Sequence, residues 1–177
     1  MKLFLLLFSP LFFLACSSSQ SPLLTVSNLE VERYAGQWHE IARLPNFFER
    51  GVVAARATYG VLPDGSISVL NEGVKESGRG SSISGKATLV GKTPDGEAKL
   101  KLRFRKFPAS LFVGDYWILD LNDEHTHAIV GGSSRKLLWL LSKDPSAQPA
   151  DFKGGIKRMA EAGFPMRSLI VNPRRIQ

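Results

Sequence analysis

The chain has 177 residues, with 23 Lys and Arg against 16 Asp and Glu, which gives a formal charge of +7. This length is enough for one domain with a sizeable core and too short for two comfortable ones. The single cysteine, Cys16, excludes an internal disulfide. The sequence also lacks a recognition helix or nucleic-acid motif, so its basic character does not indicate a DNA- or RNA-binding protein.

The first fifteen residues, MKLFLLLFSPLFFLA, predict a secretory signal peptide. Lys2 supplies the positive start, the next twelve residues are largely apolar, and Ala15 is a small residue directly before Cys16. The apolar run is too short to span a bilayer, and Pro10 interrupts it. Residues 16–27, which include the polar stretch SSSQSP, are interpreted as a processed N-terminus and tether. The remaining residues, 28–177, are expected to form one domain.

Short alternating segments separated by turn signals predict an antiparallel all-β domain. Pro63-Asp64-Gly65 and Pro94-Asp95-Gly96 are typical hairpin turns, because proline restricts φ and glycine tolerates positive φ. Eight strands joined in sequence favour an up-and-down barrel without exposed edges. The expected strands are Gln37–Leu44, Val53–Val61, Ser66–Lys75, Ser82–Val90, Glu97–Phe104, Val113–Leu121, Thr126–Gly131 and Lys136–Ser142.

The C-terminal region predicts one α-helix packed on the barrel wall. Asp151 is expected to cap a helix over Phe152–Ala162, which Gly163 and Pro165 then end. Gly154 and Gly155 weaken this helix in isolation, so it must dock against the barrel. A short final strand is expected at Ser168–Val171.

Alternate residues of a strand share a face, so Trp38, Glu40, Ala42 and Leu44 are expected to point the same way. Several other strands carry small or apolar residues on one face. An eight-stranded barrel with a small-residue lining can hold one small ligand. The strand pattern alone does not distinguish such a cavity from a fully packed core.

Three segments resemble the ordered motifs of the lipocalins, in the form found in bacterial lipocalins and apolipoprotein D. They read YAGQWHEIAR at Tyr34–Arg43, GDYWILDL at Gly114–Leu121 and LWLLSKDP at Leu138–Pro145. The resemblance covers essentially the whole mature chain and implies a barrel open at one end, with the loop from Leu44 to Val52 at the mouth. In the family an arginine packs across the Gly-x-Trp indole at the closed end. In this chain that position is Lys143, and we predict that its ammonium lies over Trp38.

The segment FLAC at residues 13–16 resembles a bacterial lipobox, although Phe13 stands where the pattern prefers leucine. This resemblance implies that Cys16 is the lipid attachment site, carrying a diacylglyceryl group and acyl chains such as palmitate. Serine at position 17 resembles lipoproteins sorted to the outer membrane. The expected location is therefore the outer membrane, with the domain held there by a lipid anchor.

The resemblance further implies a binding protein for a fatty acid, a lysophospholipid or a similar amphiphile, acting in lipid transport, storage or envelope maintenance. Gly36, Trp38 and Lys143 are expected to form the barrel base, and Phe47 and Phe48 a gate or membrane-contacting rim. The residues expected to contact the ligand are Glu40, Ala42, Phe47, Phe48, Ala55, Ala57, Tyr59, Val69, Asn71, Ala87, Leu102, Phe104, Tyr116, Ile118, Val130 and Trp139.

Glu40 has two interpretations, because a buried carboxylate needs hydrogen-bonding partners or a proton. It is either a structural group satisfied by a neighbour such as Tyr116 or an arginine, or an anchor for a ligand headgroup. No nucleophile motif accompanies the carboxylates, so an enzyme is not expected. His125 and His127 lack an obvious third ligand, so neither a metal nor another cofactor is expected. The alternatives are a lipocalin-type isomerase or de-epoxidase and a non-binding envelope scaffold, and a homodimer is left open.

Overall fold

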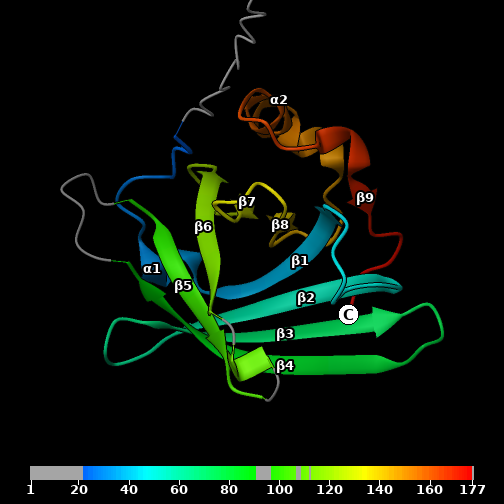
Figure 1. Cartoon of the computed structure of the whole chain (residues 1–177), viewed down its shortest axis with the longest axis horizontal. Coiled ribbons are helices and arrows are strands. Elements are labelled where there is room, and N and C mark those ends of the chain that lie inside the picture. The colour runs from blue at the N-terminus through cyan, green and yellow to red at the C-terminus, as the bar shows by residue number, and fades with distance from the viewer. Residues whose placement is uncertain (1–21, 91–96, 107–108, 112, 177) are drawn as a thin grey trace, which may run out of the picture.

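A computed structural model describes residues 22–90, 97–106, 109–111 and 113–176 (Figure 1). The expected signal peptide, the attachment site Cys16 and the turn Pro94-Asp95-Gly96 lie outside these residues. Within the described part of the chain, no helix is both long and apolar enough to cross a membrane.

The strands form a closed antiparallel barrel, as the sequence predicted. From β1 to β8 each strand pairs with the next one along the chain, and β1 also pairs with β8, which closes the sheet. A ninth short strand, β9, adds beside β1. The strands are β1 Gly36–Arg43, β2 Val52–Val61, β3 Ile67–Lys75, β4 Gly80–Leu89, β5 Lys99–Phe104, β6 Val113–Leu121, β7 His127–Gly131, β8 Leu138–Ser142 and β9 Ile170–Val171.

Because successive strands run in opposite directions, the loops fall into two sets at opposite ends. The β1–β2, β3–β4, β5–β6 and β7–β8 loops lie at one end, which we call the mouth. The β2–β3, β4–β5 and β6–β7 loops lie at the other end, which we call the base. In Figure 1 the β3–β4 loop is at the right and the β2–β3 turn is at the lower left.

Helical segments flank the barrel. The short helix α1, Val31–Tyr34, precedes β1 and was not expected from the sequence. Three single-turn 3-10 segments, η1 Ala109–Leu111, η2 Pro149–Phe152 and η3 Met166–Ser168, occur in connections, and α2 spans Lys153–Glu161.

The predicted cap of the C-terminal helix was wrong. Asp151 lies inside η2, where its carboxylate accepts a hydrogen bond from the backbone N–H of Gln148, and the residue before α2 is Phe152. Pro149, in the first turn of η2, is compatible with this tight turn before the α-helix begins. Gly163 adopts a φ of 90° after the helix, which agrees with the predicted termination.

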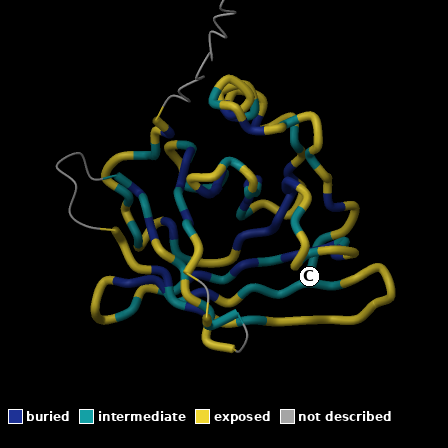
Figure 2. Tube along the Cα trace, in the orientation of Figure 1, coloured by how far each residue is buried: buried dark blue, intermediate teal, exposed yellow. Residues whose placement is uncertain are grey.

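Apolar side chains form two clusters, one on either side of the barrel wall. Figure 2 shows how the burial of each residue varies along the strands that separate them. One cluster lies on the inner face of the barrel and includes Trp38, Leu100 and Ile118. The other lies between the wall and α2 and includes Ile129 and Met159. A Cβ at Gly155 would lie 2.4 Å from Ile129 Cδ1, so this glycine lets the helix approach the wall closely.

The expected common face of Trp38, Glu40, Ala42 and Leu44 is interrupted. The pairing of β1 with β8 shifts register between Glu40 and Ala42, which marks a β-bulge. A bulge inserts one extra residue and reverses the alternation beyond it. Ala42 and Leu44 therefore belong to the cluster outside the barrel, beside α2. The expectation that Ala42 faces the interior was wrong, and Arg43 takes the inward side instead.

Candidate functional site

The base of the barrel is closed around Trp38, whose side chain is fully buried. Its indole N–H donates to the backbone carbonyl of Tyr34 over 2.8 Å. The Lys143 ammonium lies 5.1 Å from the centre of the indole ring and also donates to the carbonyl of Arg33 over 2.6 Å. Burial and the nearby Arg33 charge lower the pKa of Lys143. The predicted contact between Lys143 and Trp38 is confirmed.

Three buried tyrosines, one each from α1, β2 and β6, join their hydroxyls above this floor. The Tyr116 hydroxyl lies 2.7 Å from that of Tyr34 and donates to that of Tyr59 over 2.7 Å. Each hydroxyl carries one proton, so Tyr34 must donate to Tyr116 in this arrangement. Burial raises the pKa of all three tyrosines, which keeps these hydrogen-bonded hydroxyls neutral.

The interior wall above the tyrosines is largely apolar. Toward the mouth, β3 and β4 become more exposed (Figure 2), whereas β1, β7 and β8 stay buried. Gly85 has no room for a side chain, because a Cβ there would lie 2.8 Å from the carbonyl of Arg103. Asn71 lies level with Ala57 and Ile83 on this wall. Its Oδ1 is buried and has no hydrogen-bond partner among the described residues.

A charged network lies where the wall meets the mouth. The Arg43 guanidinium contacts two carboxylates: Nη1 lies 2.9 Å from Glu40 Oε1, and Nε lies 3.6 Å from Glu49 Oε2. Asn172, which follows β9, accepts from Arg43 and donates to Glu40 Oε1 over 2.9 Å. Arg43 and Glu40 are only 3% and 4% exposed, so this network belongs to the core.

Arg43 also bonds to the backbone that enters β2. Its Nη2 donates to the carbonyl of Val52 over 2.9 Å and to that of Glu49 over 3.1 Å. The backbone N–H of Asn172 donates to Ile41 O, and that of Arg174 donates to Val53 O. The C-terminal segment therefore bonds to both β1 and β2 at this end of the barrel, where Arg43 supplies the side-chain link.

The protonation of Glu40 follows from this sharing of one cation by two carboxylates. Burial raises the pKa of Glu40, and the negative charge of Glu49 raises it further. Arg43 opposes the shift through its charge and its hydrogen bond, as does the hydrogen bond from Asn172. Glu40 thus retains its proton to higher pH than an ordinary glutamate does.

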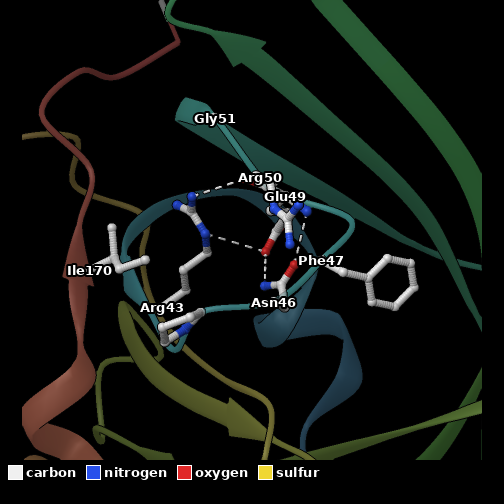
Figure 3. Close-up of a pocket in the computed structure, with 8 residues that line it drawn as sticks. Arg43, Asn46, Phe47, Glu49, Arg50, Gly51 and Ile170 are labelled. Carbon is white, nitrogen blue, oxygen red and sulfur yellow. Dashed lines mark hydrogen bonds and ion pairs between the residues drawn. The ribbon is translucent and has the colours of Figure 1, made fainter.

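Glu49 connects the network to the β1–β2 loop. Its Oε2 accepts from the indole N–H of Trp139 on β8 over 3.1 Å, and its carboxylate also contacts the Asn46 amide. Phe48 packs near the Trp139 ring, with centroids 6.4 Å apart, whereas Phe47 is 82% exposed. A hollow of about 390 Å³ lies between this loop and β9, next to Arg43 and Ile170 (Figure 3).

Comparisons with known proteins agree with this geometry. A family model described as a lipocalin-like domain matches residues 29–174. The chain belongs to the lipocalin family. Temperature-induced lipocalin-1 of Arabidopsis thaliana is 38% identical over 153 residues, covering 84% of this chain and 81% of that protein. Outer membrane lipoprotein Blc of Vibrio cholerae is 37% identical over 147 residues, covering 82% of each.

Solved structures support the lipocalin fold independently of close sequence similarity. Insecticyanin from the tobacco hornworm Manduca sexta superimposes with a TM-score of 0.67 at 20% identity, over 87% of this chain and 85% of that one. At this identity the likeness concerns the fold.

Most of the predicted lining residues of this lipocalin lie on the interior wall. Tyr59, Val69, Gly85 and Phe104 follow one line of register across β2 to β5, and Asn71 lies two residues nearer the mouth than Val69 on β3. Gly36 begins β1 at the base with a φ of 110°. The residues of the prediction that belong to the interior cluster or pack against it are Ala57, Tyr59, Val69, Ala87, Leu102, Tyr116, Ile118, Val130 and Trp139. Ala55, also buried, shares the strand face of Ala57.

Three polar members of the site were missed: Arg43, Glu49 and Asn172. Arg43 was missed because unbroken alternation from Trp38 places it outside. The partners of Glu40 are Arg43 and Asn172, whereas Tyr116 bonds to the other tyrosines. A signal was present in β1, where two opposite charges lie three residues apart, a spacing that shares a strand face only across a bulge.

Proposed function

We propose that this lipocalin binds one amphiphile, such as a fatty acid or a lysophospholipid, inside the barrel without transforming it. The observation that supports this proposal most directly is the apolar interior wall, on which Asn71 Oδ1 is buried without a hydrogen-bond partner among the described residues. A buried polar group of this kind gains from a hydrogen bond that a ligand supplies. The polar part of the ligand contacts the Asn71 amide, and its hydrocarbon covers the surrounding wall.

Glu40 serves as a structural group rather than as the ligand anchor. Its Oε1 already receives hydrogen bonds from Arg43 and Asn172. Phe47 and Phe48, from the loop beside Trp139, serve as the gate through which the ligand enters.

The binding test compares two neighbouring positions of β4. Ile83 faces the interior at the level of Asn71, and Ser82 is exposed on the opposite face. Ile83→Trp fills the lumen and is expected to weaken binding of a fluorescent fatty acid about tenfold or more. Ser82→Trp is the matched control and is expected to keep the affinity. Equal affinity of both variants, with folding verified by circular dichroism, would contradict binding inside the barrel.

The polar contact has its own test. Asn71→Leu keeps the approximate size of the side chain and removes its hydrogen-bonding groups. It is expected to weaken polar-headed ligands while a purely apolar probe of the same chain length binds as before. Native mass spectrometry and lipid extraction of the protein purified from its own membrane then identify the ligand.

We also propose that the protein is anchored to the outer membrane through acylated Cys16. There it would act in lipid transport, storage or envelope maintenance. The lipobox-like sequence supports this, as does similarity to a relative named as an outer membrane lipoprotein. The mass of the N-terminal peptide tests the modification. Cys16→Ser is expected to move the protein out of the membrane fraction, and an unchanged distribution would contradict the anchor.

A further inference from the structure

The two ends of the barrel carry opposite charge. The described residues of the four mouth loops, 44–51, 76–79, 105–106 with 109–111, and 132–137, contain six Lys and Arg residues against two carboxylates. One of these carboxylates, Glu49, already contacts Arg43 and Trp139. The described residues of the three base loops contain the carboxylates of Asp64, Glu97, Asp123 and Glu124 and no Lys or Arg.

The cations at the two ends also differ in their pairing. At the base, Arg33, Lys86 and Lys99 each form an ion pair with a carboxylate. At the mouth, the structure shows no ion pair for Arg50, Arg79, Arg105 or Lys106 with any described carboxylate. Their charge is therefore available to an external anion.

Large apolar side chains are exposed among these cations. Phe47 is 82% exposed in the β1–β2 loop, and Leu111 is 68% exposed in the β5–β6 loop. Phe48 and Val113 extend the exposed apolar surface in the same two regions. Exposed apolar groups beside basic residues are the combination that interfacial membrane-binding segments use.

We propose that the mouth of the barrel docks onto an anionic lipid surface, with the β1–β2 and β5–β6 loops at the headgroups. A cation near an anionic bilayer contributes about 1 kcal/mol, which is about a fivefold change in the docked-to-undocked ratio. The acidic base is repelled by the same surface, so the charge asymmetry also sets the orientation. The barrel opening then faces the lipid, and this inference does not depend on which molecule the lumen holds.

Hydrogen exchange of the mature protein on vesicles tests the orientation. Vesicles containing phosphatidylglycerol are compared with vesicles of pure phosphatidylcholine. Backbone amides of residues 105–106 and 109–111 in the β5–β6 loop are expected to exchange several-fold more slowly on the anionic vesicles, while amides of residues 122–126 at the base are unchanged. Equal exchange on both lipids, or slower exchange at the base, would overturn the proposal.

Matched variants separate docking from non-specific charge effects. Arg105→Ala with Lys106→Ala is expected to lower the docked-to-undocked ratio about 30-fold. Lys153→Ala with Lys157→Ala removes the same charge from the exposed face of α2 and is expected to leave it nearly unchanged. Leu111→Ser at the mouth is compared with Leu89→Ser at the base in the same way. Equal effects of the mouth and control variants contradict the proposed face.

Discussion

The base and the mouth of this barrel are held together by different chemistry. At the base, an indole and three tyrosine hydroxyls pack in a neutral core, and one partly exposed lysine covers the indole. At the mouth, one buried arginine contacts two carboxylates and two backbone carbonyls. The base therefore depends on packing and neutral hydrogen bonds, and the mouth depends on the charge state of a few side chains.

This difference determines how each end responds to its surroundings. The tyrosine hydroxyls at the base stay protonated, because burial raises their pKa values further above neutrality. At the mouth, protonation of Glu40 changes a network that includes the β1–β2 loop and the C-terminal segment. We infer that the base is the constant part of the fold and that the mouth is the part that solution conditions can alter.

The strongest test of this comparison is the removal of the mouth cation. Arg43→Met removes the cation that the buried Glu40 and the half-buried Glu49 share, together with its bonds to the Val52 and Glu49 carbonyls. It is expected to lower the free energy of unfolding by about 3–5 kcal/mol. Urea denaturation measures this loss. Arg56→Met is the control, because Arg56 pairs with Glu72 on the same barrel but is more exposed, and about 1 kcal/mol or less is expected there. Similar losses for the two variants would contradict a special role for Arg43.

The corresponding change at the base is Tyr116→Phe. It removes the middle hydroxyl, leaves those of Tyr34 and Tyr59 without this partner, and is expected to cost about 1–3 kcal/mol. Tyr59→Phe removes only the last hydroxyl of this hydrogen-bonded row, so it should lower the free energy of unfolding by less. Both losses are expected to be independent of pH near neutrality, as measured by denaturation at several pH values. A loss that varies with pH would break the contrast between the two ends.

The sequence predicted the base better than the mouth. Trp38 and Lys143 belong to family motifs, and the approach of their side chains depends on the pairing of β1 with β8 on the base side of the bulge, where His39 pairs with Ser142. The strand order followed from alternation and turn residues in the same way. These features are local, or they follow from closure of a regular sheet.

The mouth escaped prediction because it depends on an irregularity and on distant residues. The bulge between Glu40 and Ala42 reverses the face of the strand, and no glycine or proline between Gln37 and Leu44 marks it. Asn172 reaches Glu40 across 132 positions of sequence, through a segment that no alternation pattern connects to β1. The carboxylate of Glu40 indicated that a partner must exist, but it could not indicate which residue supplies it.

Replacing Glu40 sharpens the comparison through its pH dependence. The pKa of Glu40 is raised in the folded state, so its contribution to stability is present below pH 4.5 and is lost as pH rises toward the folded pKa. Glu40→Gln keeps an acceptor for Arg43 and Asn172 and removes this slope, which amounts to about 1.4 kcal/mol per pH unit at most. The pKa of His39 is lowered, so its contribution to stability rises with pH and opposes that of Glu40. The measured quantity is therefore the difference in the free energy of unfolding between wild type and Glu40→Gln at each pH, in which the His39 contribution cancels. A flat difference curve would contradict the shared-cation account.

The smallest expected effect concerns the cation at the base. Lys143→Met retains much of the apolar stem, removes the ammonium over Trp38 and its bond to the Arg33 carbonyl, and is expected to cost about 0.5–1 kcal/mol. Lys143→Arg is expected to match or exceed the stability of the wild-type protein, because a planar guanidinium can stack on the indole. Thermal denaturation at low and high salt distinguishes this contact from a surface charge effect. The stability difference between wild type and Lys143→Met should persist at high salt, where exposed charges are screened. If Lys143→Met is as destabilising as Arg43→Met, the base also depends on a single charge and the contrast between the ends fails.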